Sequence, residues 1–318
     1  DFLPDCLQSI VNQSVTEWEL LAVNDFSTDQ SLDILNHFAQ KDPRIRVLEN
    51  DRKGIAPALR MAYQNSVGTL LTRMDADDLM PPRKLEWLRD VLVKKGPGHI
   101  ATGKVRYFSE TGLREGYRRY EKWLNELTRT HTHYREIYRE CVLPSPNWMA
   151  FREDLETCGA FRSDVYPEDY DLCFRFYAQG FRIVGAQEVT HLWRDHAERT
   201  SRTSPIYANN QYFELKIPRF LQLDYDPSRP LVLWGAGRKG KQIARILNQH
   251  HITFSWVTNN AKKWGVRLSG ATLSDFQTIL RLERPFILLA VAAPGGVVEI
   301  KRFLSRYNFE PARDFFWF

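Results

Sequence analysis

MDADDLM, at residues 74–80, decides the fold assignment because it overlaps the end of an apolar run, TLLTRMD (69–75), that is typical of a buried strand. Its aspartates therefore crowd the carboxyl end of that strand, which is where open α/β sheets bind ligands. Carboxylates this close repel one another unless a cation neutralises them, and oxygen ligands suit Mg²⁺ or Mn²⁺. A second interpretation stays open, in which the acids cap a helix that begins at Pro81-Pro82.

Strand and helix signals alternate on both sides of this stretch. The expected elements are helices at 5–13, about 30–40, 53–66, 81–94, 153–158 and 170–179, and strands at 18–24, 45–49, 69–75 and 147–151. This order predicts a mostly parallel sheet with helices on both faces. The highly charged segment 117–140 predicts a solvated surface helix, with a dedicated recognition element as the alternative.

A change in composition marks a second α/β unit. DYDPSRP, at residues 224–230, combines two prolines with polar residues and predicts a linker. Beyond it the pattern of strands and helices restarts. The predicted domains are therefore 1–223 and 231–318.

The second unit opens with a glycine-rich turn. LVLWGAGRKGKQIA contains G-x-G-x-x-G as Gly235, Gly237 and Gly240, between a strand and a helix, where backbone N–H groups can bind phosphate. The next strand ends in Val257-Thr258-Asn259-Asn260 and lacks the acid expected at a ribose. A dinucleotide site, a structural role, an oligomerising role and an acceptor-related role all remain open for this unit, which resembles truncated Rossmann-like modules.

Two more acidic clusters stand at predicted element ends. Asn24 and Asp25 follow a buried strand in VNDFSTDQS, and Glu168 and Asp169 begin a helix in YPEDYDLCFRF. Each cluster alone has a second interpretation, as a turn or helix cap or as complement to a helix dipole. Three such clusters in this order indicate one shared site.

The order of these three motifs resembles the family 2 glycosyltransferases of the GT-A fold. SPNWMAFREDLETCGAF (145–161) and WRDHAERTSR (193–202) are similar to two further segments of that family. The resemblance covers about residues 1–205. It implies a GT-A nucleotide-diphospho-sugar transferase fold, an α/β architecture, followed by the smaller Rossmann-like α/β domain.

The resemblance also implies donor-binding roles. Asn24 and Asp25 would lie at the nucleotide, with Asp25 on its base or ribose. Asp75 and Asp77 would form the DxD element, in which Asp77 holds Mn²⁺ or Mg²⁺ and Asp75 contacts the ribose or the metal. His196 would bind the metal or the diphosphate, and a surface or capping histidine is the other interpretation.

The implied reaction moves a sugar from a nucleotide-diphosphate donor to an acceptor hydroxyl with inversion. Asp169 would be the general base, with Glu168 as the alternative. UDP-linked donors and saccharide or lipid-linked acceptors of bacterial surface polysaccharide are expected, in the cytoplasm or at the inner face of its membrane. Two alternatives are an NAD(P)-type oxidoreductase that uses the C-terminal glycine turn, and a non-catalytic protein that binds sugar nucleotides or other proteins.

The composition limits the partners. The formal net charge of +5 allows an anionic substrate or peripheral membrane association. No pattern of basic and aromatic residues indicates nucleic-acid binding. The four cysteines include no C-x-x-C pair, so buried free thiols are expected rather than a zinc site. Homo-oligomerisation stays open.

One departure from the family concerns the first strand. The family begins with a strand of the type VSVIIPVYN just before the helix at which this chain starts. The expectation is that this central strand is missing, leaving an incomplete nucleotide pocket, and that the chain is weakened or inactive without it. Turnover of sugar nucleotides after restoring upstream residues tests this expectation, and equal activity refutes it.

Overall fold

The computed structural model of the chain describes residues 2–110, 112–203 and 212–318. Its internal contacts define two units. The first unit runs to His133 and resumes at Val142–Arg199, and the second unit comprises Tyr134–Cys141 and Thr200–Phe318. Each unit is treated by itself below.

The first unit alternates helices with strands, as the apolar runs predict. Its helices are α1 (Leu3–Val11), α2 (Ser31–Lys41), α3 (Ile55–Asn65), α4 (Lys84–Lys95), α5 (Glu115–Thr130), α6 (Arg152–Thr157) and α7 (Glu168–Ala178). Its strands are β1 (Leu20–Asn24), β2 (Ile45–Glu49), β3 (Leu70–Thr72), β4 (His99–Phe108), β5 (Trp148–Phe151) and β6 (Arg182–Arg194).

The strands of the first unit pair in two groups. β1 and β2 are parallel to each other. The other group has the order β3-β5-β4-β6, in which β5 is antiparallel to both of its neighbours and β4 is parallel to β6. The parallel pairing of β1 with β2 agrees with the mostly parallel sheet that the sequence predicts. β4 and β6, which the sequence did not predict as strands, are also parallel, whereas β5 is antiparallel to both of its neighbours.

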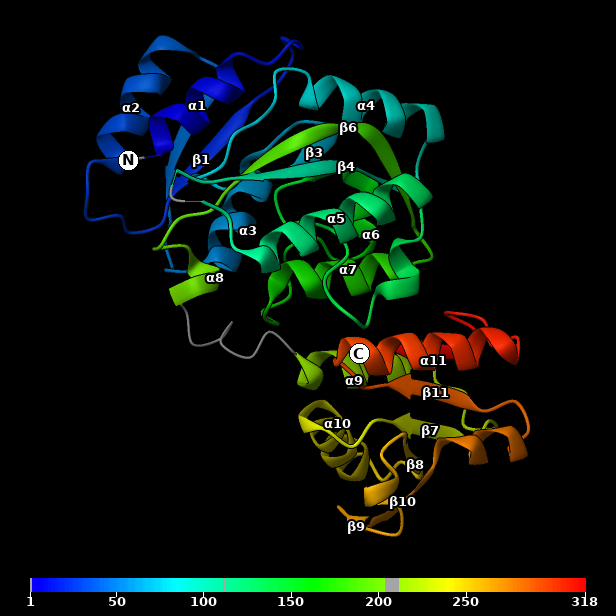
Figure 1. Cartoon of the computed structure of the whole chain (residues 1–318). Helices are drawn as coiled ribbons and strands as arrows, with labels where there is room; N and C mark the ends of the chain where they lie inside the picture. Colours follow the sequence, from blue (N-terminus) through cyan, green and yellow to red (C-terminus); the bar gives the residue numbers. More distant parts are fainter. Residues whose placement is uncertain (1, 111, 204–211) are drawn as a thin grey trace. The chain divides into compact units, whose positions relative to one another are not determined.

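Two helices bury opposite sides of β4 and β6 (Figure 1). Leu88 and Leu92 of α4 pack against Ala101 and neighbouring apolar side chains of the sheet. Leu124 of α5 packs with Val105 and other residues of the same strands. The few buried side chains of the highly charged helix α5 are thus enough to hold it against the sheet while its other side stays in solvent.

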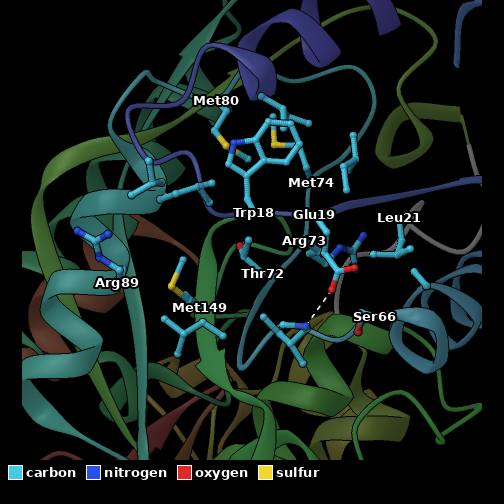
Figure 2. A pocket seen from close by; sticks show the side chains of 18 of the residues that line it. Trp18, Glu19, Leu21, Ser66, Thr72, Arg73, Met74, Met80, Arg89 and Met149 are labelled. Atoms are coloured by element: carbon cyan, nitrogen blue, oxygen red, sulfur yellow. Dashed lines mark hydrogen bonds between the residues drawn. The ribbon is translucent and has the colours of Figure 1, made fainter. Parts of the chain in front are cut away.

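A cavity of about 820 Å³ lies between β1 and β3. Within the described residues, β1 pairs with β2 alone and β3 pairs with β5 alone, so each strand has a second edge without a partner strand. Figure 2 shows Trp18 grouped with Met80 on one side of the cavity and Met149 on another. The lining is largely apolar, and Arg73 lies at its boundary.

The second unit is a parallel sheet flanked by helices. Its helices are α8 (Thr200–Thr203), α9 (Phe213–Leu223), α10 (Arg238–Gln249) and α11 (Pro294–Arg306). Its strands are β7 (Leu231–Trp234), β8 (Ser255–Thr258), β9 (Arg267–Leu268), β10 (Ala271–Asp275), β11 (Phe286–Leu289) and β12 (Phe315–Trp317). Short 3₁₀ helices are η1 (His133–Glu136), which crosses the boundary between the units, η3 (Ala261–Lys263) and η4 (Phe276–Arg281).

The order of this second sheet is β12-β11-β7-β8-β10-β9. All neighbouring pairs are parallel except β9 with β10. β7 and β11 are buried at every position because helices cover the sheet. The α/β pattern expected for the C-terminal region is therefore present.

The unit boundaries differ from the sequence-based boundaries. The sequence analysis ends the first domain at residue 223, whereas the contacts place α9 in the second unit. They also place Tyr134–Cys141 there, although this segment lies between two parts of the first unit. Contacts between distant segments decide such membership, and a local composition shift does not report them.

Two further properties concern the chain as a whole. The four cysteines are buried and free, as predicted. Across residues 2–110, 112–203 and 212–318, no helix has both the length and the apolar character needed to cross a membrane.

Candidate active site

The acidic motif forms a loop directly after β3, and the end of β6 holds that loop in place. Leu79 and Leu192 exchange two backbone hydrogen bonds, with N···O distances of 3.0 and 3.1 Å. The Arg194 side chain donates from Nε to the Asp77 carbonyl oxygen at 2.8 Å. The conformation of the motif is therefore set by a strand more than a hundred residues further along the chain.

Asp78 is turned into the interior and differs from the other two aspartates of the motif. Its side chain is 1% exposed and accepts hydrogen bonds from the Arg194 backbone N–H at 2.8 Å and from His191 Nε2 at 3.0 Å. Burial, reinforced by Asp75 and Asp77, raises the pKa of Asp78 to about 8. Asp78 thus anchors the loop.

Lys84 continues this buried chain of polar groups. Its Nζ donates to the Pro146 carbonyl oxygen at 2.6 Å and lies 3.4 Å from His191 Nδ1. Burial lowers the pKa of Lys84 to about 8 and also lowers the pKa of His191. A neutral His191 that donates from Nε2 to Asp78 and accepts at Nδ1 satisfies all three groups.

Asp77 and His196, two of the candidate metal ligands, lie next to each other. Asp77 Oδ2 and His196 Nε2 are 3.0 Å apart, and both side chains are partly exposed. The alternative, in which the acids cap the following helix, is wrong, because α4 begins at Lys84 and receives no side-chain cap. The described part of the chain holds no group of three or more His, Cys, Asp or Glu side chains arranged to bind a metal ion together.

These two ligand types fit a metal that a substrate helps to bind. Mg²⁺ in particular is commonly held by one or two carboxylates, several waters and substrate phosphates rather than by a complete protein cage. Asp77 supplies a carboxylate and His196 supplies a ring nitrogen, and both reach solvent. The residues therefore suit a shared site and do not form a complete cage by themselves.

Arg73 connects the acidic motif to the first residue of α7. Its Nη2 donates to Asp75 Oδ1 at 2.8 Å and its Nη1 donates to Glu168 Oε1 at 3.0 Å. Asp75 and Glu168 are far apart in the sequence, so this guanidinium brings two of the predicted acidic clusters into one place. Burial alone would lower the pKa of Arg73, but the Asp75 and Glu168 carboxylates outweigh this effect, so the net shift of the pKa is upward.

Asp169 follows Glu168 in the first turn of α7. Burial, with the neighbouring Glu168 carboxylate, raises the pKa of Asp169 to about 7, while Arg73 acts in the opposite direction. The negative charge of Asp75 also raises this pKa. The third acid of the motif, Asp171, is fully buried and accepts from Arg175 Nε at 2.9 Å, which gives it a structural role.

Asp25 lies at the end of β1 and binds the start of α3. Its Oδ1 accepts from Asn50 Nδ2 at 2.7 Å and from the Gly54 backbone N–H at 2.9 Å. Asn24 Oδ1 accepts from the Ser27 backbone N–H at 3.2 Å, a local turn contact. Among the described residues, neither side chain forms a hydrogen bond or ion pair with Asp75 or Asp77, so their nucleotide roles stay predictions.

The glycine turn of the second unit is tightly packed at one position and open at another. A Cβ added to Gly240 would lie 1.9 Å from the Gly235 carbonyl oxygen, while a Cβ on Gly237 would meet nothing within 4 Å. Gly235 has a φ of +125° and its carbonyl accepts from Trp256 Nε1 at 2.8 Å. Lys239 donates to the Phe318 carbonyl oxygen at 2.8 Å. Packing alone accounts for Gly240, and phosphate binding stays a prediction.

The sequence analysis missed the residues that hold the site together. Arg73 directly precedes the acidic motif, and its position was the only signal that could have identified it. His191 and Arg194 lie on β6, which was not predicted as a strand. Lys84 was read only as part of a helix, and its buried ammonium group became evident from its contact with Pro146.

The comparison with known families agrees with the motifs. Residues 1–159, half of the chain, match the family described as glycosyl transferase family 2. The chain belongs to this family and is therefore a glycosyltransferase enzyme. The predicted family and fold class are confirmed.

The share of each relative that aligns with this chain differs from one relative to the next. The chain is 27% identical over 260 residues to the putative glycosyltransferase EpsE of Bacillus subtilis, covering 78% of this chain and 88% of that protein. It is 31% identical over 104 residues to the putative teichuronic acid biosynthesis glycosyltransferase TuaG of the same organism, covering 32% of this chain and 41% of that protein.

A solved structure is also similar. The mannosyltransferase PcManGT from Pyrobaculum calidifontis, in complex with GDP-Man and Mn²⁺, aligns with a TM-score of 0.49 and 20% identity. The alignment covers 70% of this chain and 64% of that chain.

Proposed function

We propose that this chain transfers a sugar from a nucleotide-diphosphate donor to an acceptor hydroxyl, with inversion at the anomeric carbon. The observation that carries the proposal is the pair of hydrogen bonds from Arg73 to Asp75 and Glu168. They join the acidic motif to the first turn of α7, so the candidate donor-binding carboxylates and the candidate base belong to one site.

The donor side of the site consists of carboxylates and one histidine. Asp75 is fixed by Arg73, and Asp77 lies beside His196. Asp77 and His196 would hold Mn²⁺ or Mg²⁺, which when bound stabilises the negative charge that develops on a departing diphosphate. Asp25, at the end of β1, would contact the base or ribose of the nucleotide.

The acceptor side depends on Asp169. A pKa of about 7 leaves a large fraction of this carboxylate ionised at neutral pH and gives it useful strength as a base. Asp169 accepts the proton of the acceptor hydroxyl as its oxygen attacks the anomeric carbon and the donor diphosphate leaves. A single displacement of this kind inverts the centre and needs no enzyme nucleophile. Glu168 is bound to Arg73, which favours Asp169 as the base.

The substrates follow from the family and its relatives. We expect UDP-linked donors and saccharide or lipid-linked acceptors that lead to bacterial surface polysaccharide. The similarity to TuaG, named as a putative teichuronic acid biosynthesis glycosyltransferase, supports this class of product. Reaction in the cytoplasm or at the inner face of its membrane suits a nucleotide-sugar donor.

Thermal unfolding with nucleotides tests the donor site. UDP, GDP and dTDP are each added with and without Mn²⁺, and a ligand at a hundred times its Kd should stabilise the folded protein by about 2.7 kcal/mol. Protection by one of them should depend on Mn²⁺ and be lost in Asp77→Asn. Asp90→Asn, at an exposed position of α4, is the control and should keep the protection.

A panel of sugar nucleotides then tests the reaction. Transfer or hydrolysis of one donor, with an inverted product, is expected from the chain extended by a first strand of the family type, and weaker or no turnover from the chain without it. Protection by NAD(P) together with no response to any nucleoside diphosphate would contradict the proposal and favour the oxidoreductase alternative. Binding of a sugar nucleotide without any turnover in either form would favour a non-catalytic binding protein.

A further inference from the structure

We propose that Arg73 is a positioning residue that fixes the donor-binding aspartate and the first turn of α7 at one separation. The inference rests on the proposed function and adds a residue to it. Arg73 directly follows β3, a strand held on one edge by β5 through the pairs Leu70 with Phe151 and Thr72 with Met149. Its guanidinium therefore projects from a part of the chain that is anchored in the sheet.

The geometry uses both terminal nitrogens of the guanidinium. Nη2 binds Asp75 and Nη1 binds Glu168, at 2.8 and 3.0 Å. A planar, permanently charged fork can hold two carboxylates at a fixed angle and spacing, which a single ammonium group cannot do. The contact to Asp75 is local, whereas the contact to Glu168 spans 95 positions in the sequence.

Burial makes the loss of either partner of this ion pair energetically costly. The side chains of Arg73 and Glu168 are only 12% and 11% exposed. Glu168 Oε2 and Arg73 Nε are both buried without a hydrogen-bond partner among the described residues. A buried charge that loses its partner pays a large desolvation cost, so Arg73 and Glu168 hold each other in place.

The position of Glu168 determines which other residue is fixed by its contact with Arg73. Glu168 is the first residue of α7, and Asp169 is the second. Successive residues of a helix are carried by one rigid backbone, so fixing Glu168 relative to β3 also fixes Asp169 relative to Asp75. A displacement of about 1 Å between reacting groups can lower a rate about a hundredfold.

Arg73 also sets the charge state of the base. The groups that act on Asp169 are Glu168 and Asp75, which favour its protonation, and Arg73 and the Tyr170 backbone N–H, which favour its ionisation. Arg73 is the cation in this set. Its removal leaves Asp169 under the influence of two carboxylates without their cation, and Asp169 then holds its proton to a higher pH.

The experiment compares Arg73→Met, Arg73→Lys and a control, Arg129→Met, at an exposed ion pair of α5. Arg73→Met should lower kcat about 10- to 100-fold, with a smaller change in the KM of the donor. The acidic limb of its kcat/KM profile should move to higher pH. Arg73→Lys restores a positive charge but not the fork, so it should recover the pH profile and only part of kcat. Arg129→Met should match the wild type.

Two results would overturn the inference. One is an Arg73→Met protein with wild-type kcat and pH profile. The other is a loss of activity in Arg73→Met and Arg73→Lys that follows the loss of folded protein, measured by circular dichroism, while the pH profile of the remaining activity stays fixed. If the wild type transfers no sugar from any donor, the proposed function itself fails. Wild-type turnover with an unaffected Arg73→Met refutes this inference alone.

Discussion

Asp169 and Glu168 are adjacent in the sequence, but their different surroundings favour Asp169 as the general base. Asp169 stands one step from Glu168 in α7, yet the two carboxyl groups have different surroundings. Glu168 is bound to a guanidinium, while burial raises the pKa of Asp169 to about 7. A buried carboxyl group whose pKa lies near neutral pH is the arrangement expected where a residue accepts a proton.

Asp169→Asn tests this assignment. The variant should lower kcat about 10²- to 10⁴-fold because the amide cannot accept the acceptor proton. Donor binding, measured by nucleotide-dependent thermal protection, should change little. In the wild type, kcat/KM should rise with pH up to about 7 and then level off, since the group must be deprotonated to act.

The control for this prediction is Asp164→Asn, at an exposed ion pair with Arg60. It should leave both kcat and the pH profile unchanged. Substantial transfer by Asp169→Asn, with a wild-type acidic limb, would assign the base to another group. Glu168→Gln would then be the next variant to measure.

At the residue level, sequence analysis identified the acids and missed the cations. Asp75, Asp77 and His196 stand in recognisable motifs, and the structure places Asp77 and His196 in contact. Arg73 and Lys84 carry no motif of their own. Their importance arises from partners that are distant in the sequence, and only the folded chain brings those partners within hydrogen-bonding distance.

At the level of elements, apolar runs in the sequence were sufficient to predict the short strands of the first unit but not its two long strands. β2 was predicted at its observed bounds, 45–49, and β1 and β5 nearly so. β4 and β6 were missed, because glycines and polar residues such as Gly103 and Gln187 interrupt their apolar pattern. β4 and β6 shift register near Gly103, where the Thr190 side chain fills the space that a Cβ would need.

The cavity between β1 and β3 bears on the expectation of a further strand. Both strands present an edge to it without a partner strand among the described residues, and its lining is mostly apolar. An extended apolar segment inserted there could pair with both edges and fill the space. This expectation stays a prediction, with the test of restored upstream residues given above. Arg73 lies at the same cavity, so filling it would bury this residue further.

The turn between β7 and α10 offers an element-scale prediction with a matched control. Gly240→Ala should destabilise the second unit by about 1–3 kcal/mol, since its Cβ would overlap the Gly235 carbonyl oxygen. Gly237→Ala should leave stability nearly unchanged, because its Cβ would meet open space and its φ is −88°. Urea unfolding of both variants measures the difference.

The same pair of variants separates packing from phosphate binding. If the turn binds a nucleotide phosphate, Gly237→Ala should weaken that binding while the protein stays stable, because the backbone must approach the ligand there. Equal stability of Gly240→Ala and the wild type would contradict the packing explanation. The glycine pattern in the sequence is the same under both explanations, which is why the sequence alone left them open.

At the level of the whole molecule, the chain crosses between its two units more often than composition suggests. It leaves the first unit at His133, contributes Tyr134–Cys141 to the second unit and returns at Val142. The sequence analysis read 117–140 as one charged helix, since charge dominates its composition. The structure ends α5 at Thr130 and buries Tyr138 completely.

Tyr138 shows why this short segment belongs to the second unit. Its ring lies 4.8 Å from Phe316, 5.3 Å from Phe318 and 5.6 Å from Phe220, measured between ring centroids. Its hydroxyl donates to Asp224 Oδ2 at 2.5 Å. A fully buried aromatic ring with these partners contributes to the core of the unit that surrounds it.

Tyr138→Ala should therefore destabilise the second unit by about 3–5 kcal/mol, as truncation of large buried aromatic side chains does. Tyr138→Phe should cost about 0.5–1.5 kcal/mol because it loses only the hydrogen bond. Tyr307→Ala, at a residue 41% exposed, is the control and should cost less than Tyr138→Ala. Hydrogen exchange read by mass spectrometry should show lost protection in β7 and β11 of Tyr138→Ala, with β4 and β6 unchanged. Lost protection confined to β4 and β6 would instead assign Tyr134–Cys141 to the first unit.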